Sequence, residues 1–312
     1  MTQIEPAKKP STHSDYAERI LRVLSHVQSH LDEAIGPADL ARVAGFSPHH
    51  FHRIFRGMVG ESVMGHVRRL RLERAAWRLK FSEHPVTRLA FDAGYETHES
   101  FTRAFKERFG AAPRDFRAQH RRLDFPAAPT GVHYHPRGEI QGFDRPMTEH
   151  GSPDGAGRIG IDHWSAREVA YVRHVGPYNE VGQAWDKLST WAAAQGLFGP
   201  GAAMLGLCYD DPEVTAAERI RYDACLEVTV GFEARGEIGR RQVPGGEYAV
   251  ARHTGPYDQL ASTYVELLGR WLPASGRAPE ALPTVEVYWN DPDATPAEEL
   301  ETDLGILLKP QT

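Results

Sequence analysis

Hydrophobic residues recur every three to four positions through the first third of the chain, which is the spacing of amphipathic helices. This pattern predicts one helix over Tyr16–Leu31 and a longer one over Glu61–Phe81. Between them, Leu40–Gly60 predicts two short helices joined by a tight turn at Gly45, with Ser47 as the N-cap of the second. The N-terminal third is therefore expected to be all-α.

A second copy of this helix–turn–helix pattern lies over Leu89–Gly110. Its first helix and turn match the first copy at an offset of 49 residues, and its second helix matches at an offset of 50. An internal duplication of this kind predicts two helix-turn-helix units held by one connecting helix. The matched positions are Leu40-Ala41 with Leu89-Ala90, Ala44-Gly45-Phe46 with Ala93-Gly94-Tyr95, and Phe51, Arg53, Phe55 and Gly60 with Phe101, Arg103, Phe105 and Gly110.

After about residue 160 the pattern changes to strands alternating with helices, and it again repeats. Arg-His-x-Gly-Pro-Tyr occurs at Arg173 and again at Arg252, an offset of 79, and Asp-Pro follows at Asp211 and Asp291, an offset of 80. We expect an α+β domain of two repeated strand-helix-strand-strand units, with one antiparallel sheet and a ligand groove between the halves. The predicted helices are Val181–Ala194 and Leu260–Trp271; the strands after them are Leu205–Tyr209, Tyr222–Val230, Thr284–Trp289 and Glu301–Leu308.

Proline and glycine are dense between these two patterns and predict a linker. The expected organisation is two domains: a disordered arm over 1–15, an all-α double helix-turn-helix domain over 16–122, a linker over 123–157 and the α+β domain over 158–310.

Charge separates the two halves of the chain. Residues 1–125 hold 21 Lys and Arg against 15 Asp and Glu, a net of +6, whereas residues 126–312 hold 15 against 27, a net of −12. A basic half beside an acidic half is expected when one domain meets phosphate and the other does not.

The composition argues for a cytoplasmic protein without a cofactor. No apolar run approaches the roughly 20 residues of a membrane span, and the N-terminus lacks the apolar core of a signal peptide. The two cysteines, Cys208 and Cys225, fit a reducing compartment. No Cys pair or helical HxxxH offers metal-ligand spacing; His133 and His135 could chelate on a strand, but we expect no metal.

The quoted helix–turn–helix motifs resemble the DNA-binding domain of the AraC/XylS family. The resemblance implies that each second helix enters a major groove of double-stranded DNA, in successive grooves about 34 Å, or roughly 10 bp, apart. It also implies RNA polymerase as a partner. The family positions that face bases fall on His49, His52, Arg53, His98, Glu99, Thr102 and Arg103.

The chemistry of these positions is uneven. Arg53 and Arg103 can each donate two hydrogen bonds to a guanine, and Thr102 can contact a thymine methyl group. Glu99 could accept from cytosine or repel phosphate. We call the two helix-turn-helix units, Leu40–Gly60 and Leu89–Gly110, the first and the second reader. Two further residues near the exposed face of the first reader, His50 and Arg56, suit contacts to the DNA backbone. The alternative is that all of these are solvent-facing residues on small helices.

The connecting helix has a second, basic face. It carries Arg68, Arg69, Arg71, Arg74, Arg78 and Lys80. We expect a solvated face rather than a direct DNA contact.

The C-terminal half resembles the GyrI-like effector-binding domain, through its Gly-Pro-Tyr and Asn-Asp-Pro pieces. The resemblance implies binding of a small, amphipathic or cationic organic effector between the two halves, with an acidic residue inside.

The repeat selects Glu286 as that residue, because its counterpart in the first half is Gly206. A carboxylate in the middle of an apolar strand is costly to bury without a partner. Alternation places Tyr288 on the same face. The alternative is a solvated sheet face, or an ion pair with an arginine such as Arg173 or Arg252. Candidate walls of the effector site are Tyr171, Trp185, Tyr222, Phe232, Tyr257 and Trp289.

The leading hypothesis is a transcription regulator in which effector binding in the acidic half alters DNA binding by the basic half. One alternative is a small-molecule hydrolase with Glu286 as general base, although the sequence shows no nucleophile–base pair, metal set or phosphate loop. The other is a DNA-binding protein whose C-terminal half only docks a partner.

Overall fold

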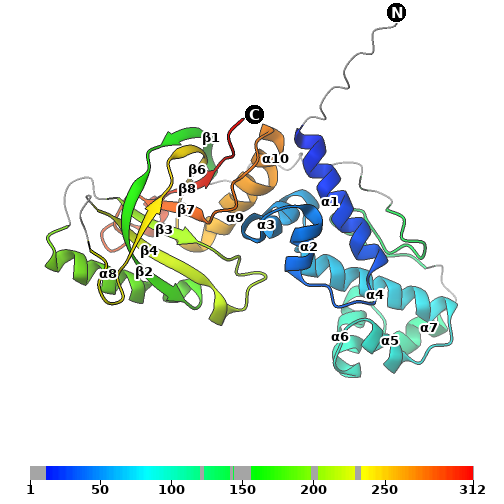
Figure 1. Ribbon diagram of the computed structural model, residues 1–312. Helices are drawn as coiled ribbons and strands as arrows, with labels where there is room; N and C mark the ends of the chain where they lie inside the picture. Colours follow the sequence, from blue (N-terminus) through cyan, green and yellow to red (C-terminus); the bar gives the residue numbers. More distant parts are fainter. Residues whose placement is uncertain are drawn as a thin grey trace, which may run out of the picture. The chain divides into compact units, whose positions relative to one another are not determined.

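The computed structural model describes residues 12–119, 123–140, 143, 156–197, 203–228 and 233–311 (Figure 1). The chain divides into a helical unit, Asp15–Thr148, and a sheet unit that contains Glu149–Thr312. Each unit is described by itself. Most of the predicted N-terminal arm, the predicted wall residue Phe232 and most of residues 141–155 lie outside the described residues. Within the described ranges, no helix is both long and apolar enough to cross a membrane.

The helical unit contains both predicted helix pairs and the connecting helix. The first pair is α2 and α3, the second is α5 and α6, and α4 runs between them (Figure 1). A short helix after α6, α7, was not expected. The bounds are α1 Thr12–Ser29, α2 Pro37–Ala44, α3 Pro48–Val59, α4 Val63–Phe81, α5 Val86–Asp92, α6 His98–Phe109 and α7 Pro113–Ala118.

The two turn glycines are required by backbone conformation. Gly45 ends α2 with φ 67°, and Gly94 follows α5 with φ 83°, both in the left-handed region that side chains with a Cβ disfavour. At Gly94 an added Cβ would also lie 2.9 Å from Nη1 of Arg71. The duplicated glycine of the sequence pattern therefore marks the turn in each copy.

Aromatic rings fill the core of the second helix pair. Phe101 and Phe105 of α6 are fully buried, with ring centroids 5.5 Å apart, and Phe116 of α7 packs edge-on against Phe105 at 5.2 Å. Leu89 and Ala90 of α5 complete this cluster. The unpredicted α7 thus closes the core of the second reader.

The basic face of α4 is not the solvated surface that the sequence predicts. Arg69 and Arg74 are 7% and 4% exposed, whereas Arg68 is exposed. Arg69 donates to the carboxylates of Glu61 (2.6 Å) and Glu73 (3.0 Å). These two guanidiniums bind groups within the helical unit, because carboxylates and backbone carbonyls surround α4.

Residues 126–135, within the predicted linker, lie against the helical unit. The buried Glu73 accepts hydrogen bonds from the backbone N–H of Tyr134 (2.9 Å) and from Nη2 of Arg108 (3.2 Å), and its Oε1 lies 3.2 Å from Nδ1 of His133. Gln28 donates to the carbonyl of His133 at 2.6 Å. We call residues 126–135 the strap.

The sheet unit is an eight-stranded sheet in the order β1-β6-β8-β7-β3-β4-β2-β5. Among the described strands, each neighbouring pair is antiparallel. The edge strands β1 and β5 were not predicted. The bounds are β1 Ala156–Trp164, β2 Arg167–Val175, β3 Met204–Cys208, β4 Arg221–Glu227, β5 Gly239–Val243, β6 Gly246–Thr254, β7 Thr284–Tyr288 and β8 Glu301–Leu307.

Two helical segments pack on one face of this sheet. The first is α8, Gly182–Ala194; the second is α9, Leu260–Tyr264, which continues through a π-helical stretch, Val265–Trp271, into α10, Leu272–Ser275. The buried Leu188 of α8 lies in one cluster with Val172 and Tyr222 of the sheet. Side chains of the opposite parity form a second apolar cluster on the other face.

Candidate functional site

The five DNA-contact candidates of the first reader all lie on α3. Phe51, Ile54 and Phe55 form the core face of this 12-residue helix and are buried. His49, His52, Arg53 and Arg56 fall on the other side by helical spacing, and the ring of His50 lies 6.4 Å from that of His49. The exposed face that the sequence predicts is not observed, however: His50, His52 and Arg53 are buried, and His49 and Arg56 are half-buried.

The candidates of the second reader lie in the first two turns of α6. Glu99 and Arg103 are exposed, and His98 and Thr102 are half-buried. Thr97 caps the helix, with its hydroxyl accepting from the backbone N–H of Ser100 at 3.1 Å. Glu99 in the first turn suits the positive end of the helix dipole, so the structure offers it a role without DNA.

Arg53 and Arg103 occupy the same place in their helices. Each is the sixth residue of a 12-residue helix that ends at a left-handed glycine, Gly60 or Gly110. The one-residue difference in offset between the copies therefore falls before the second helix and leaves the arginines equivalent.

Glu286 lies at the middle of the sheet, on the central strand β7. It is 6% exposed and pairs across the strands with Gly206 of β3. The hydroxyl of Tyr264, from α9, donates to its Oε1 at 2.7 Å, and the hydroxyl of Tyr288 donates to its Oε2 at 2.5 Å. The carboxylate is thus held from both sides.

The hydrogen bonds continue outward from Tyr288. Its oxygen lies 3.0 Å from that of Tyr222, and Nε1 of Trp185 donates to Tyr222 at 3.1 Å. Since Tyr288 gives its one proton to Glu286, Tyr222 must donate to Tyr288. We call Glu286, Tyr264, Tyr288, Tyr222 and Trp185 the Glu286 cluster; all its donors point toward the carboxylate.

Burial keeps the tyrosines of this cluster protonated. Desolvation raises the pKa of Tyr222 and of Tyr288 well above the ordinary value, and the charge of Glu286 raises both further. The hydroxyls therefore act as hydrogen-bond donors toward Glu286.

Gly206 makes room for this arrangement. An added Cβ there would lie 2.6 Å from the hydroxyl oxygens of both Tyr222 and Tyr288. The residue opposite Glu286 must therefore lack a side chain for the two tyrosines to meet.

Tyr257 packs against the cluster from the Gly-Pro turn before α9. Its ring lies edge-on to Tyr288 at 5.6 Å, and the side chain is 38% exposed. Nε2 of His253 lies 3.2 Å from the carbonyl of Pro256 and shapes that turn. The repeated His-x-Gly-Pro-Tyr motif thus aims a tyrosine at the sheet.

Two predicted wall residues do not reach Glu286. Tyr171 packs over Gly239, with Arg241 above its ring at 5.0 Å. Trp289 donates to Asp303 at 2.8 Å and is 57% exposed. Both belong to the other face of the sheet, because side chains alternate along a strand.

The predicted arginine alternative for Glu286 is not what the structure shows. Arg173 pairs with Asp223, and Arg252 pairs with Asp303, in both cases through two nitrogens. Tyr264, in contrast, was missed by the sequence analysis. The repeat offset of 79 aligns it with Trp185 and could have identified it.

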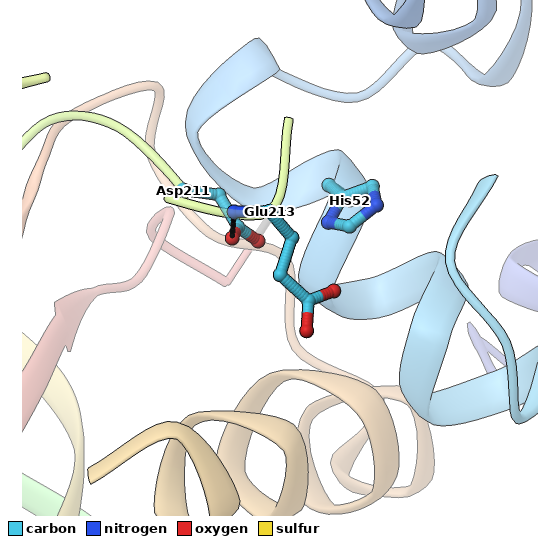
Figure 2. A group of neighbouring side chains, drawn as sticks. All are labelled: His52, Asp211 and Glu213. Atoms are coloured by element: carbon cyan, nitrogen blue, oxygen red, sulfur yellow. Dashed lines mark hydrogen bonds between the residues drawn. The ribbon is translucent and has the colours of Figure 1, made fainter. Parts of the chain in front are cut away.

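The repeated Asp-Pro motif has a local structural role. The Asp211 carboxylate accepts a hydrogen bond from the Glu213 backbone N–H, drawn as a dashed line in Figure 2. The distance between the two atoms is 2.9 Å. Asp291 accepts from Asp293 in the same way, also at 2.9 Å. Each aspartate therefore closes its own turn.

The two histidines considered for metal chelation turn to different carboxylates. His133 lies 3.2 Å from Glu73, and Nε2 of His135 lies 3.8 Å from Glu139. The structure gives this pair no common ligand position.

Comparison with known proteins identifies both parts of the chain. A model for a GyrI-like small molecule binding domain matches residues 159–309, and a model for a helix-turn-helix domain matches residues 40–119. The chain therefore combines an AraC-type helix-turn-helix domain with a C-terminal GyrI-like domain, and both predicted resemblances are confirmed.

Similar proteins are named as regulators. The chain is 36% identical over 108 residues to the uncharacterized HTH-type transcriptional regulator YbfP of Bacillus subtilis (strain 168), covering 35% of this chain and 37% of the relative. It is 36% identical over 104 residues to the probable transcriptional regulator YgiV of Escherichia coli (strain K12), covering 33% and 65%. The chain thus spans roughly one to two thirds of these relatives' length.

A solved structure of an EcmrR–DNA complex is also similar. The match has a TM-score of 0.43 and 17% identity, and it covers 49% of this chain and 57% of that one.

Proposed function

We propose that this chain is a one-component transcription regulator of the cytoplasm. Its helical unit binds a specific site on double-stranded DNA, and its sheet unit binds a small organic effector that changes the grip on DNA or on RNA polymerase. The combination of a matched helix-turn-helix domain with a matched small-molecule domain supports this.

In this proposal α3 and α6 enter successive major grooves. Arg53 and Arg103, at equivalent helix positions, read guanine, and His49, His52, His98, Glu99 and Thr102 contact neighbouring bases. His50 and Arg56 contact the DNA backbone. Because the two helices differ in every one of these side chains except the arginine, the site is asymmetric, and one molecule is sufficient to occupy it.

The proposed effector site is the helix-side face of the sheet around Glu286. The observation that carries it is a buried carboxylate whose hydrogen-bond donors, among the residues that the structure describes, are tyrosine hydroxyls, with aromatic rings around it. An aromatic surround with one anion suits an amphipathic cation, which gains both Coulombic and cation–π attraction.

We further propose that the sheet unit is a duplicated strand-helix-strand-strand unit. The order β2-α8-β3-β4 recurs as β6-α9-β7-β8, and the central pair β3–β7 joins the halves. In this proposal the effector lies at the junction of the two copies.

Effector binding is tested on the full chain by calorimetry with tetraphenylphosphonium, with neutral triphenylphosphine oxide as the comparison ligand. Glu286→Gln is expected to weaken the cation at least about tenfold, or about 1.4 kcal/mol, and to leave the neutral ligand unchanged. Two opposite unit charges about 5 Å apart attract by about 3 kcal/mol at an effective dielectric constant of about 20, so a tenfold loss is a conservative expectation. Glu298→Gln, an exposed carboxylate of the same unit, is the control.

If Glu286→Gln binds both ligands as the wild type does, Glu286 is not the effector anion. If candidate esters or epoxides are turned over by the wild type and not by Glu286→Gln, the hydrolase alternative holds instead.

DNA recognition is tested with a site selected from random duplexes. Arg53→Ala and Arg103→Ala should each cost about 1–3 kcal/mol and relax specificity only at their own part of the site. Equal weakening on all sequences would make them phosphate contacts.

A further inference from the structure

Three arginines of α4 lie on one side of the helix. Arg71, Arg74 and Arg78 are three and four residues apart, so their side chains follow one another along one face. Their acceptors belong to two segments far apart in sequence. One is the loop Leu31–Glu33, which leads from α1 into α2; the other is Asp92, where α5 ends.

Arg71 and Arg78 bind mainly one segment each. Arg71 donates to the carbonyls of Leu31 (3.1 Å) and Glu33 (2.6 Å). Arg78 donates to the Asp92 carboxylate at 2.8 Å, and its second contact, with Asp32, is 3.8 Å.

Arg74 is the residue that binds both segments closely. Its Nη2 donates to the Asp92 carbonyl at 2.7 Å and to the Leu31 carbonyl at 3.3 Å, and its Nη1 pairs with the Asp32 carboxylate at 2.8 Å. The side chain is 4% exposed. A single guanidinium therefore joins the entry to the first helix pair to the turn of the second.

The geometry of arginine is needed for this contact. The guanidinium presents donors on a rigid planar fork, whereas a lysine ammonium is one point charge on a flexible stem. Backbone carbonyls at Leu31 and Asp92 accept two of these donors, so the fork fixes chain positions and not only side chains. Burial makes the contact costly to lose, because the carbonyls and the charge would remain unpaired.

We propose that Arg74 is the positioning residue that sets the separation between the two DNA-reading helices. It touches no DNA itself; by tying the loop before α2 and the end of α5 to one point of α4, it holds the α2–α3 pair and the α5–α6 pair in register with successive grooves. This inference rests on the proposed two-groove binding.

The test measures tolerance to the spacing of the DNA site. Duplexes carry the selected site at its natural spacing or with one base pair inserted between its halves, which moves the second groove by about 3.4 Å and about 35°. Further duplexes carry either half alone. Full-length wild type, Arg74→Ala, Arg74→Lys and the control Arg22→Ala, an exposed arginine of α1, are compared.

The wild type and Arg22→Ala should lose at least about tenfold in affinity when the base pair is inserted. In Arg74→Ala the penalty should fall to about threefold or less, since the second pair can follow the displaced groove, while half-site affinities stay within about twofold. Arg74→Lys should show the same reduced penalty for the inserted base pair as Arg74→Ala. If the alanine variant does not fold, the penalty measured with Arg74→Lys tests the proposal in its place.

An unchanged spacing penalty in the folded variants overturns the inference, as does an equal loss on the half sites. A wild type without any spacing penalty refutes the two-groove proposal itself, and Arg74 then has nothing to position.

Discussion

Replacing Glu73 by glutamine should lower the free energy of unfolding of the helical unit and release the strap. Glu73 has no exposed surface, and four donors surround its carboxylate at 2.9–3.2 Å, from Arg69, Arg108, His133 and the backbone of Tyr134. A glutamine of the same shape keeps one acceptor oxygen but turns an amide NH₂ toward some of these donors.

The size of the effect follows from what remains for each partner. Breaking a buried ion pair by removing one member costs about 3–5 kcal/mol. Arg69 retains its second carboxylate, Glu61, and Arg108 is 22% exposed, so that water can partly replace the lost contact. We therefore expect the lower end, about 3 kcal/mol of unfolding free energy.

Hydrogen exchange followed by mass spectrometry measures this in the full chain, peptide by peptide. Peptides from α4 and from the strap should exchange faster by the equivalent of that free energy, and peptides of the sheet unit should not change. Glu83→Gln, an exposed carboxylate near the end of α4, should stay within about 0.5 kcal/mol. A loss below about 1 kcal/mol in Glu73→Gln would refute the view that this carboxylate holds the strap.

Two further outcomes are expected. Acid should lower the midpoint of thermal unfolding of the helical unit, followed by circular dichroism, in two steps. The first step begins below about pH 6.5, because desolvation lowers the pKa of His66 and only the unfolded chain takes up its proton. The second step runs from about pH 4.5 toward pH 2. The second step belongs to Glu61, where desolvation would raise the pKa but hydrogen bonds from His66 and Arg69 lower it to about 2. His66→Ala should abolish the first step and make the second smaller, because it also removes one of the hydrogen bonds that lower the pKa of Glu61. Gly206→Ala should cost about 1–3 kcal/mol of unfolding free energy, because the added Cβ would crowd the two tyrosine hydroxyls beside it. Gly160→Ala should cost less, because an added Cβ there meets open space. Equal shifts in melting temperature for the two variants would contradict the crowding.

The repeats made most of the fold predictable. The helix boundaries of the readers differ from the prediction by a few residues, since the turn glycines and N-caps mark them in the sequence. Six strands were predicted, two that run into the repeated Gly-Pro turns and four from short apolar runs. The edge strands β1 and β5 were not, because strands at an edge bury little and carry a weak pattern.

The candidate site was predictable only in part. Parity along β7 places Tyr288 with Glu286, as expected, and excludes Trp289. Tyr264 comes from a helix, where periodicity identifies a buried face but does not identify its partner. The same reason hid the role of Arg74: a row of arginines on a helix has the same sequence pattern whether it faces water or buried carbonyls.

The strap changes the position at which the helical unit can be separated from the rest of the chain. The helical pattern ends near residue 122, yet Glu73, Gln28 and Arg108 depend on groups supplied by residues 126–135. A gene fusion or recombination event that cut after residue 122 would leave a buried carboxylate without its backbone partner. The portable module therefore extends past His135, and swaps that keep this segment with its own helices are the ones expected to yield folded chimaeras.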